Sequence, residues 1–138
     1  MIDDLLRQGL VKKLPVDQKK VDDAIAHARR DLITAGTLLA SDHDWAYTIA
    51  YNAVLQAGRA LMFSKGYRPE GASQHIAVVK FVGLYLDQND TICFDRMRRK
   101  RNSSVYDTAG TITENEAEFA LTQAEALVKK IVCCIERA

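Results

Sequence analysis

The sequence contains few of the residues that interrupt helices or that build disulfide scaffolds. Its 138 residues include only two prolines and seven glycines. The long stretches between them are rich in Ala, Leu, Lys, Arg, Gln and Glu, a composition typical of helices. The three cysteines form no Cys-x-x-Cys pair, and an odd number argues against a disulfide framework. We therefore expect an all-α protein of a reducing compartment.

Membrane, targeting and cofactor signals are also missing. No apolar run has the length of a membrane span, and residues 1–14 contain two acids and no signal-peptide core. The chain has no glycine-rich phosphate loop, no Gly-x-Ser-x-Gly motif and no paired catalytic carboxylates. His27 and His43 lack the spacing of metal ligands. We expect a cytoplasmic protein without membrane contact, cofactor or metal.

The apolar pattern indicates a single helical domain. With 48% hydrophobic residues, a chain of this length can bury roughly two-thirds of its unfolded surface in one core. Residues 1–15 read as a short helical leader that ends at Pro15. Apolar residues then recur at helical steps over four longer stretches, 17–40, 44–65, 90–107 and from the Thr113-x-x-Glu116 capping box onward, and over a shorter one at 73–86. The sequence predicts an up-and-down bundle of four long helices plus a short N-terminal helix, in one domain over residues 1–138.

One face of the expected helix over 44–65 is uniformly small. Its residues follow a four-three-four-three spacing: Ala46, Ala50, Ala53, Ala57 and Ala60. Such a face lets a neighbouring helix approach closely. We expect this stripe, and Arg101 on the apolar stripe of the helix over 90–107, to need a partner, and we therefore predict a homodimer.

The densest charge in the chain lies between Arg96 and Arg101, where five of six residues are basic although the net charge is only +1. A local basic patch of this kind commonly faces phosphate or an acidic partner, while a plain solvated helix face is the alternative. Arg101 falls on an apolar stripe with Phe94, Met97 and Val105. Three polar residues stand four apart on the adjacent stripe: Arg98, Asn102 and Tyr106.

Several segments together resemble the HEPN domain family. They are Trp45-Ala-Tyr-Thr-Ile-Ala-Tyr-Asn-Ala-Val, Arg59-Ala-Leu-Met-Phe-Ser-Lys-Gly-Tyr-Arg-Pro, His75, and Arg101-Asn-x-x-x-Tyr106. The resemblance implies a bundle of four or five helices that is often dimeric. Several members are metal-independent RNA endonucleases of toxin-antitoxin, phage-defence and CRISPR systems. Many bacterial and archaeal members are encoded beside a minimal nucleotidyltransferase.

The family's catalytic signature is an Arg, commonly followed by Asn, with a His four to six residues after the Arg. Arg101 and Asn102 match this signature, but Tyr106 stands in the place of the His. An imidazole can accept or give a proton at neutral pH, whereas a phenol with a pKa of about 10 is a poor base. The resemblance thus makes Arg101, Asn102 and Tyr106 the expected catalytic positions, with little RNA cleavage expected.

Other residues are expected to support binding at the same site. These are Arg98, Arg99 and Lys100 of the basic run, together with Tyr51 and His75. Tyr51 could equally be a core aromatic whose hydroxyl reaches an acceptor, and His75 a packing or capping residue. Three functions stay open: a ribonuclease toxin, a non-catalytic module that binds RNA or a nucleotide, and a scaffold subunit for a nucleotidyltransferase.

Overall fold

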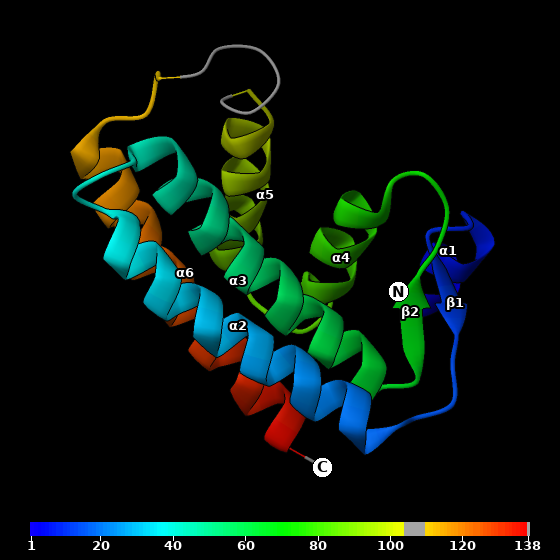
Figure 1. Ribbon diagram of the computed structural model, residues 1–138. Helices are drawn as coiled ribbons and strands as arrows, with labels where there is room; N and C mark the ends of the chain where they lie inside the picture. Colours follow the sequence, from blue (N-terminus) through cyan, green and yellow to red (C-terminus); the bar gives the residue numbers. More distant parts are fainter. Residues whose placement is uncertain (104–109, 138) are drawn as a thin grey trace.

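A computed structural model describes residues 1–103 and 110–137 of the chain, and these residues form a helical bundle (Figure 1). The elements in chain order are α1 (Ile2–Arg7), β1 (Val11–Lys13), α2 (Gln18–Leu38), α3 (His43–Ser64), β2 (Tyr67–Pro69), α4 (Gln74–Val82), α5 (Gln88–Asn102) and α6 (Glu114–Glu136). Helix α3 contacts α2, α4, α5 and α6. The predicted all-α bundle is confirmed.

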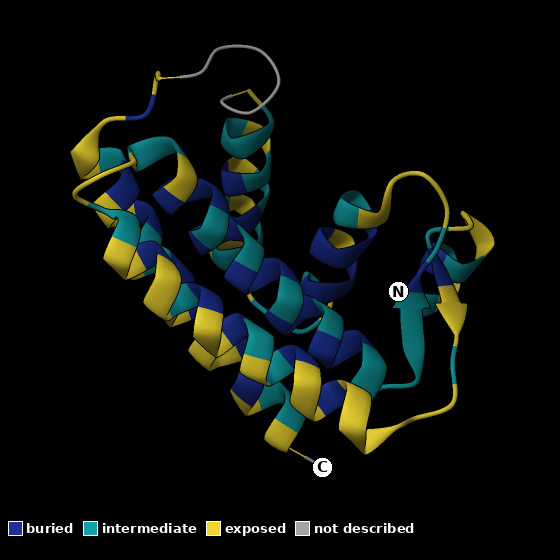
Figure 2. Cartoon of the chain, in the orientation of Figure 1, coloured by how far each residue is buried: buried dark blue, intermediate teal, exposed yellow. Residues whose placement is uncertain are grey.

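Helix α3 is the centre of the core and is buried around most of its circumference (Figure 2). Its alanine stripe is almost fully buried within the single chain, and so are the larger side chains of its other faces, such as Tyr51, Leu55 and Leu61. A helix that is apolar on all sides belongs in the interior. The expectation that the alanine stripe needs a second chain is wrong, because α2 and the other helices of the same chain already cover it.

The strongest local signals of the sequence set the helix ends. The Asp17 carboxylate accepts a hydrogen bond from the Lys19 backbone at the start of α2. Thr113 and Glu116 form both bonds of the capping box at the start of α6. Gly66 follows α3 with a φ of 86°, a left-handed conformation that favours glycine. Each cap satisfies backbone groups that a helix end leaves without partners.

Expectations for two segments are corrected, and a third lies partly outside the described residues. The leader helix ends at Arg7, and Val11–Lys13 is instead a strand that pairs antiparallel with Tyr67–Pro69. Ser73 precedes α4 but makes no side-chain cap bond, and α4 ends at Val82 rather than near residue 86. Helix α5 is assigned as far as Asn102, and the remainder of its expected range falls largely at 104–109, outside the described residues.

Within the described part of the chain, no helix combines the length and the apolarity that a membrane crossing needs.

Candidate functional site

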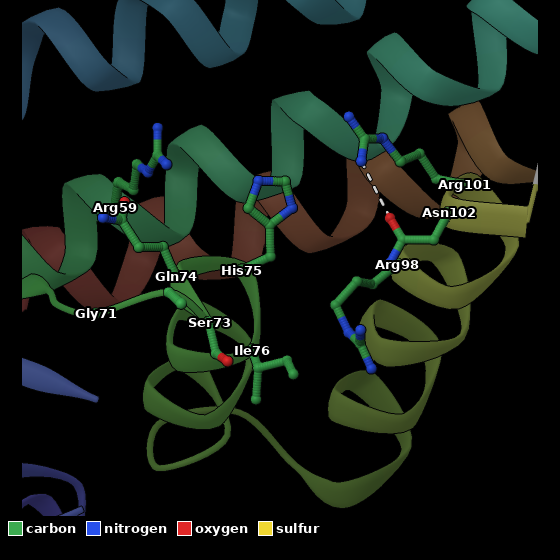
Figure 3. A pocket seen from close by; sticks show the side chains of 10 residues that line it. Arg59, Gly71, Ser73, Gln74, His75, Ile76, Arg98, Arg101 and Asn102 are labelled. Carbon is green, nitrogen blue, oxygen red and sulfur yellow. Dashed lines mark hydrogen bonds between the residues drawn. The ribbon is translucent and has the colours of Figure 1, made fainter. Parts of the chain in front are cut away.

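A pocket of about 490 Å³ opens between α3, the start of α4 and the end of α5 (Figure 3). Arg59 comes from α3, and Arg98, Arg101 and Asn102 come from the last turns of α5. The loop before α4 and its first turn supply the remaining lining residues: Gly71, Ala72, Ser73, Gln74, His75 and Ile76. Three guanidinium groups therefore gather from two helices around one opening.

No carboxylate is among the residues that line this pocket in the described part of the chain. The pocket lies instead at the N-terminal end of α4, where helix backbone N–H groups carry partial positive charge. The partial charge of the helix N-terminus and the charges of the guanidinium groups are therefore both positive here. The arrangement is suited to an anion with several acceptor oxygens, such as a phosphate.

The three arginines are held in different ways. The Arg98 Nε donates to Asp95 Oδ1 at 2.9 Å, which fixes its stem against α5. The Arg101 Nη1 donates to the side-chain oxygen of Asn102 at 3.0 Å. Arg59 makes no hydrogen bond or ion pair with any residue that the structure describes. Within the described part of the chain, its charge is available to a ligand.

His75 lies in the middle of the pocket, between Arg59 on one side and Arg98 and Arg101 on the other (Figure 3). Its Nδ1 is 2.9 Å from the hydroxyl oxygen of Tyr51. Burial, followed by the charges of Arg101, Arg59 and Arg98, holds the pKa of His75 below its usual value. The ring is therefore neutral near pH 7 when no anion is bound.

Tyr51 connects the three helices that form the pocket. It belongs to α3, is 1% exposed, and packs against Phe94 of α5 and His75 of α4 with ring centroids 5.9 and 5.8 Å apart. Burial raises the pKa of its hydroxyl, so the phenol keeps its proton. Tyr51 is thus a core aromatic, and its hydroxyl lies at hydrogen-bond distance from a residue that lines the pocket.

The chain matches the HEPN domain model over residues 21–135. It belongs to the HEPN domain family. Among solved structures it is similar to the crystal structure of TT1696 from Thermus thermophilus, with a TM-score of 0.69 and 18% sequence identity. The alignment covers 83% of this chain and 98% of that chain, which supports the fold alone. No curated protein matches the chain.

The HEPN domain brings together some of the residues that the sequence nominated and separates others. Arg98, Arg101, Asn102 and His75 line one pocket, with Tyr51 directly behind His75. Arg99 and Lys100, which were also nominated, lie outside this lining. Arg99 pairs with Asp95, and Lys100 pairs with Glu116 of α6. Tyr106 lies outside the described residues.

Arg59 is the pocket residue to which sequence reasoning gave no role. A signal for it exists, because Arg59 is the only Lys or Arg in the 22 residues of α3, a helix that is otherwise mostly apolar. A cation in such a helix needs an anion or an exit to solvent. In this HEPN domain the pocket provides that exit.

The described residues of the HEPN domain contain no group of three His, Cys, Asp or Glu side chains that could hold a metal ion. The side chains that line the pocket carry guanidinium, imidazole, amide and hydroxyl groups.

Proposed function

We propose that this HEPN protein binds phosphate groups of RNA or of a nucleotide in the pocket between α3, α4 and α5, as one component of a toxin-antitoxin or defence pair. The observation that supports the proposal is the pocket lining, in which Arg59, Arg98 and Arg101 surround His75 without a carboxylate among the described residues. Arginine forms paired, charge-assisted bonds with phosphate oxygens.

The proposed roles of the arginines and of Asn102 follow the placement of their side chains, and that of Tyr106 follows its position in the sequence. Arg101 would hold a phosphate, and Asn102, whose side-chain oxygen already accepts from Arg101, would orient it or the adjacent ribose. Arg59 and Arg98 would approach the same anion from α3 and from the preceding turn of α5. Tyr106, the family's histidine position, would donate a further hydrogen bond.

The test of this proposal is binding of a short fluorescent single-stranded RNA, and in parallel of ATP, to the purified chain at low salt. The variant Arg98→Ala/Arg99→Ala/Lys100→Ala should bind RNA more weakly whatever its sequence. Its plot of log affinity against log salt should flatten by about 0.7 for each lost phosphate contact. Absence of binding by the parent, or an unaltered triple variant, would reduce the basic run to a solvated helix face.

The paired variant Arg99→Ala/Lys100→Ala is the matched control within this run. Arg99 is held by Asp95 and Lys100 by Glu116, and neither lines the pocket. We expect this double variant to retain most of the parent's affinity, so that Arg98 accounts for most of the triple variant's loss. A double variant that binds as poorly as the triple would place the RNA outside the pocket.

We expect little or no metal-independent RNA cleavage by the purified protein at neutral pH, because Tyr106 replaces the family's histidine. The measurement is incubation of labelled RNA with the protein in EDTA, with RNA binding measured in the same samples. Cleavage that persists in EDTA and disappears in Tyr106→Phe would show that the phenol is an active proton-transfer group, and would favour a ribonuclease toxin.

A homodimer is part of the proposal, since HEPN domains are often dimeric. Large apolar side chains remain on the surface of the single chain for such a contact, including Trp45 at 56% and Phe119 at 63% exposure. Light scattering at micromolar concentration should give about twice the chain mass of 15.4 kDa. A mass near that of one chain would contradict the dimer.

The runner-up function is a scaffold subunit for a minimal nucleotidyltransferase. It predicts that the purified chain binds neither RNA nor ATP by itself and forms a stable complex with such a partner. The binding experiment above separates the two functions.

A further inference from the structure

The hydroxyl of Tyr51 has one hydrogen-bond partner among the described residues, the Nδ1 of His75 at 2.9 Å. Tyr51 is 1% exposed, and a buried O–H group needs an acceptor because solvent cannot supply one. Nδ1 can accept only if it carries no proton. This need is met when the Tyr51 O–H donates to Nδ1, which places the proton of the neutral ring on Nε2.

This bond also opposes protonation of the ring. If Nδ1 took up a proton, it would become a donor, and the Tyr51 hydroxyl would lose its acceptor in a buried position. The charged groups that face His75 act in the same direction, since Arg59 of α3 and Arg98 and Arg101 of α5 all lower the pKa of His75. Asp95, the nearby carboxylate of α5, is bound by Arg98 and Arg99.

We propose that Tyr51 and His75 form a locked pair in which the Tyr51 hydroxyl fixes His75 as a neutral ring that donates its Nε2–H to a phosphate oxygen in the pocket. His75 is then a binding residue that exchanges no proton with the ligand, and Tyr51 is a positioning residue that acts through it. An N–H donor in the pocket favours a ligand with hydrogen-bond acceptors, and phosphate oxygens are such acceptors. The inference rests on the proposed function, because it assigns a contact to the same pocket.

The lock predicts an unusual pH dependence. The phosphodiesters of an RNA without terminal phosphate do not titrate between about pH 5.5 and 8, so any change in affinity there reports on the protein. A ring that became charged when RNA bound would bind more tightly as the pH falls, by up to about tenfold per pH unit. Wild-type protein should instead gain much less affinity than this as the pH falls, because the bond from Tyr51 disfavours the charged ring in both states.

Tyr51→Phe should release the lock. The ring of Phe keeps the packing against Phe94, while Nδ1 loses its donor and can be protonated. We expect the affinity of this variant for RNA to increase as the pH falls from 8 to 6, and to increase more per pH unit than that of the wild type. Circular dichroism on the same samples checks that the variant is folded. A wild-type affinity that rises with acid as steeply as that of Tyr51→Phe would overturn the lock.

The tautomer can be read directly from the full chain labelled with ¹⁵N-histidine. The chain has three histidines, and the signals of His75 are those that disappear from the spectrum of His75→Gln. At pH 7 the ¹⁵N shifts of His75 should show a protonated Nε2 and a bare Nδ1, and its titration midpoint should lie below about 6.5. In Tyr51→Phe both neutral tautomers of His75 should be populated, and the titration midpoint of His75 should move to higher pH. A wild-type ring protonated at Nδ1 would exclude the proposal whatever the binding data show.

The donor role has its own test in the affinity for RNA at pH 7. His75→Gln retains a neutral N–H donor and should keep more affinity than His75→Leu, which should lose on the order of tenfold. Equal losses in the two variants would remove the donor role. If RNA fails to bind at any pH, the proposed function falls together with the phosphate contact, while the ¹⁵N spectrum still decides the tautomer.

Discussion

Arg101→Met should strongly weaken binding of RNA and ATP while the protein keeps or raises its melting temperature. Arg101 shares the pocket with Arg59 and Arg98, so its removal takes away a phosphate contact and relieves repulsion between like charges. Charge-assisted hydrogen bonds contribute about 1.5–3 kcal/mol, so the affinity should fall by roughly one to two orders of magnitude. Fluorescence anisotropy and a thermal melt on the same preparation measure both quantities.

Arg99→Met is the matched control for this experiment. It removes the same charge from the same helix, but Arg99 is 73% exposed, pairs with Asp95 and does not line the pocket. Affinity should change little, apart from the general effect of one lost surface charge. Asn102→Ala should follow Arg101→Met more weakly, since Asn102 orients the Arg101 side chain. If Arg101→Met unfolds the protein, or leaves binding per folded molecule unchanged, Arg101 has an architectural role instead.

The fold could be predicted where local chemistry alone decides the structure. The capping box at Thr113 and the aspartate before α2 act within one turn of a helix, so the sequence contains all the interacting groups. The pair of short strands could not be predicted in this way. Val11–Lys13 is too short to show an alternating pattern, and it is a strand only because Tyr67–Pro69, far away in the chain, provides its hydrogen bonds.

The site shows the same division between local and distant information. Arg98, Arg101 and Asn102 were predicted together because they share one end of α5. Arg99 and Asp95 stand four apart on α5, a spacing that allows an ion pair within the helix. Spacing along that helix could not tell that Lys100 turns to Glu116, because this acid comes from α6. Arg59 and the Tyr51–His75 bond depend on how α3 packs against α4 and α5, which no periodicity within one helix reveals.

The position of α4 depends on a close contact with α3 at Gly58. A Cβ atom added there would lie 2.5 Å from Val78 Cγ1 and 3.0 Å from Val82 Cγ2, distances that require the two helices to separate. Val78 and Val82 are fully buried, so neither has space to move. The absent side chain at Gly58 thus lets α4 approach α3, and α4 carries His75 into the pocket.

Gly58→Ala should therefore destabilise the protein even though alanine is the better helix former. Alanine in a helix interior gains about 1 kcal/mol over glycine, whereas overpacking a core costs about 1–3 kcal/mol. We expect a net loss in the free energy of unfolding, measured by urea denaturation, together with weaker RNA binding because His75 moves relative to Arg101.

Gly36→Ala in α2 is the control, since its Cβ would lie 3.7 Å from Leu121 Cδ2, an ordinary contact. That variant should be as stable as the parent or more stable. Equal stability of the two variants would mean that α4 can shift freely, and that α3–α4 packing does not set the geometry of the pocket.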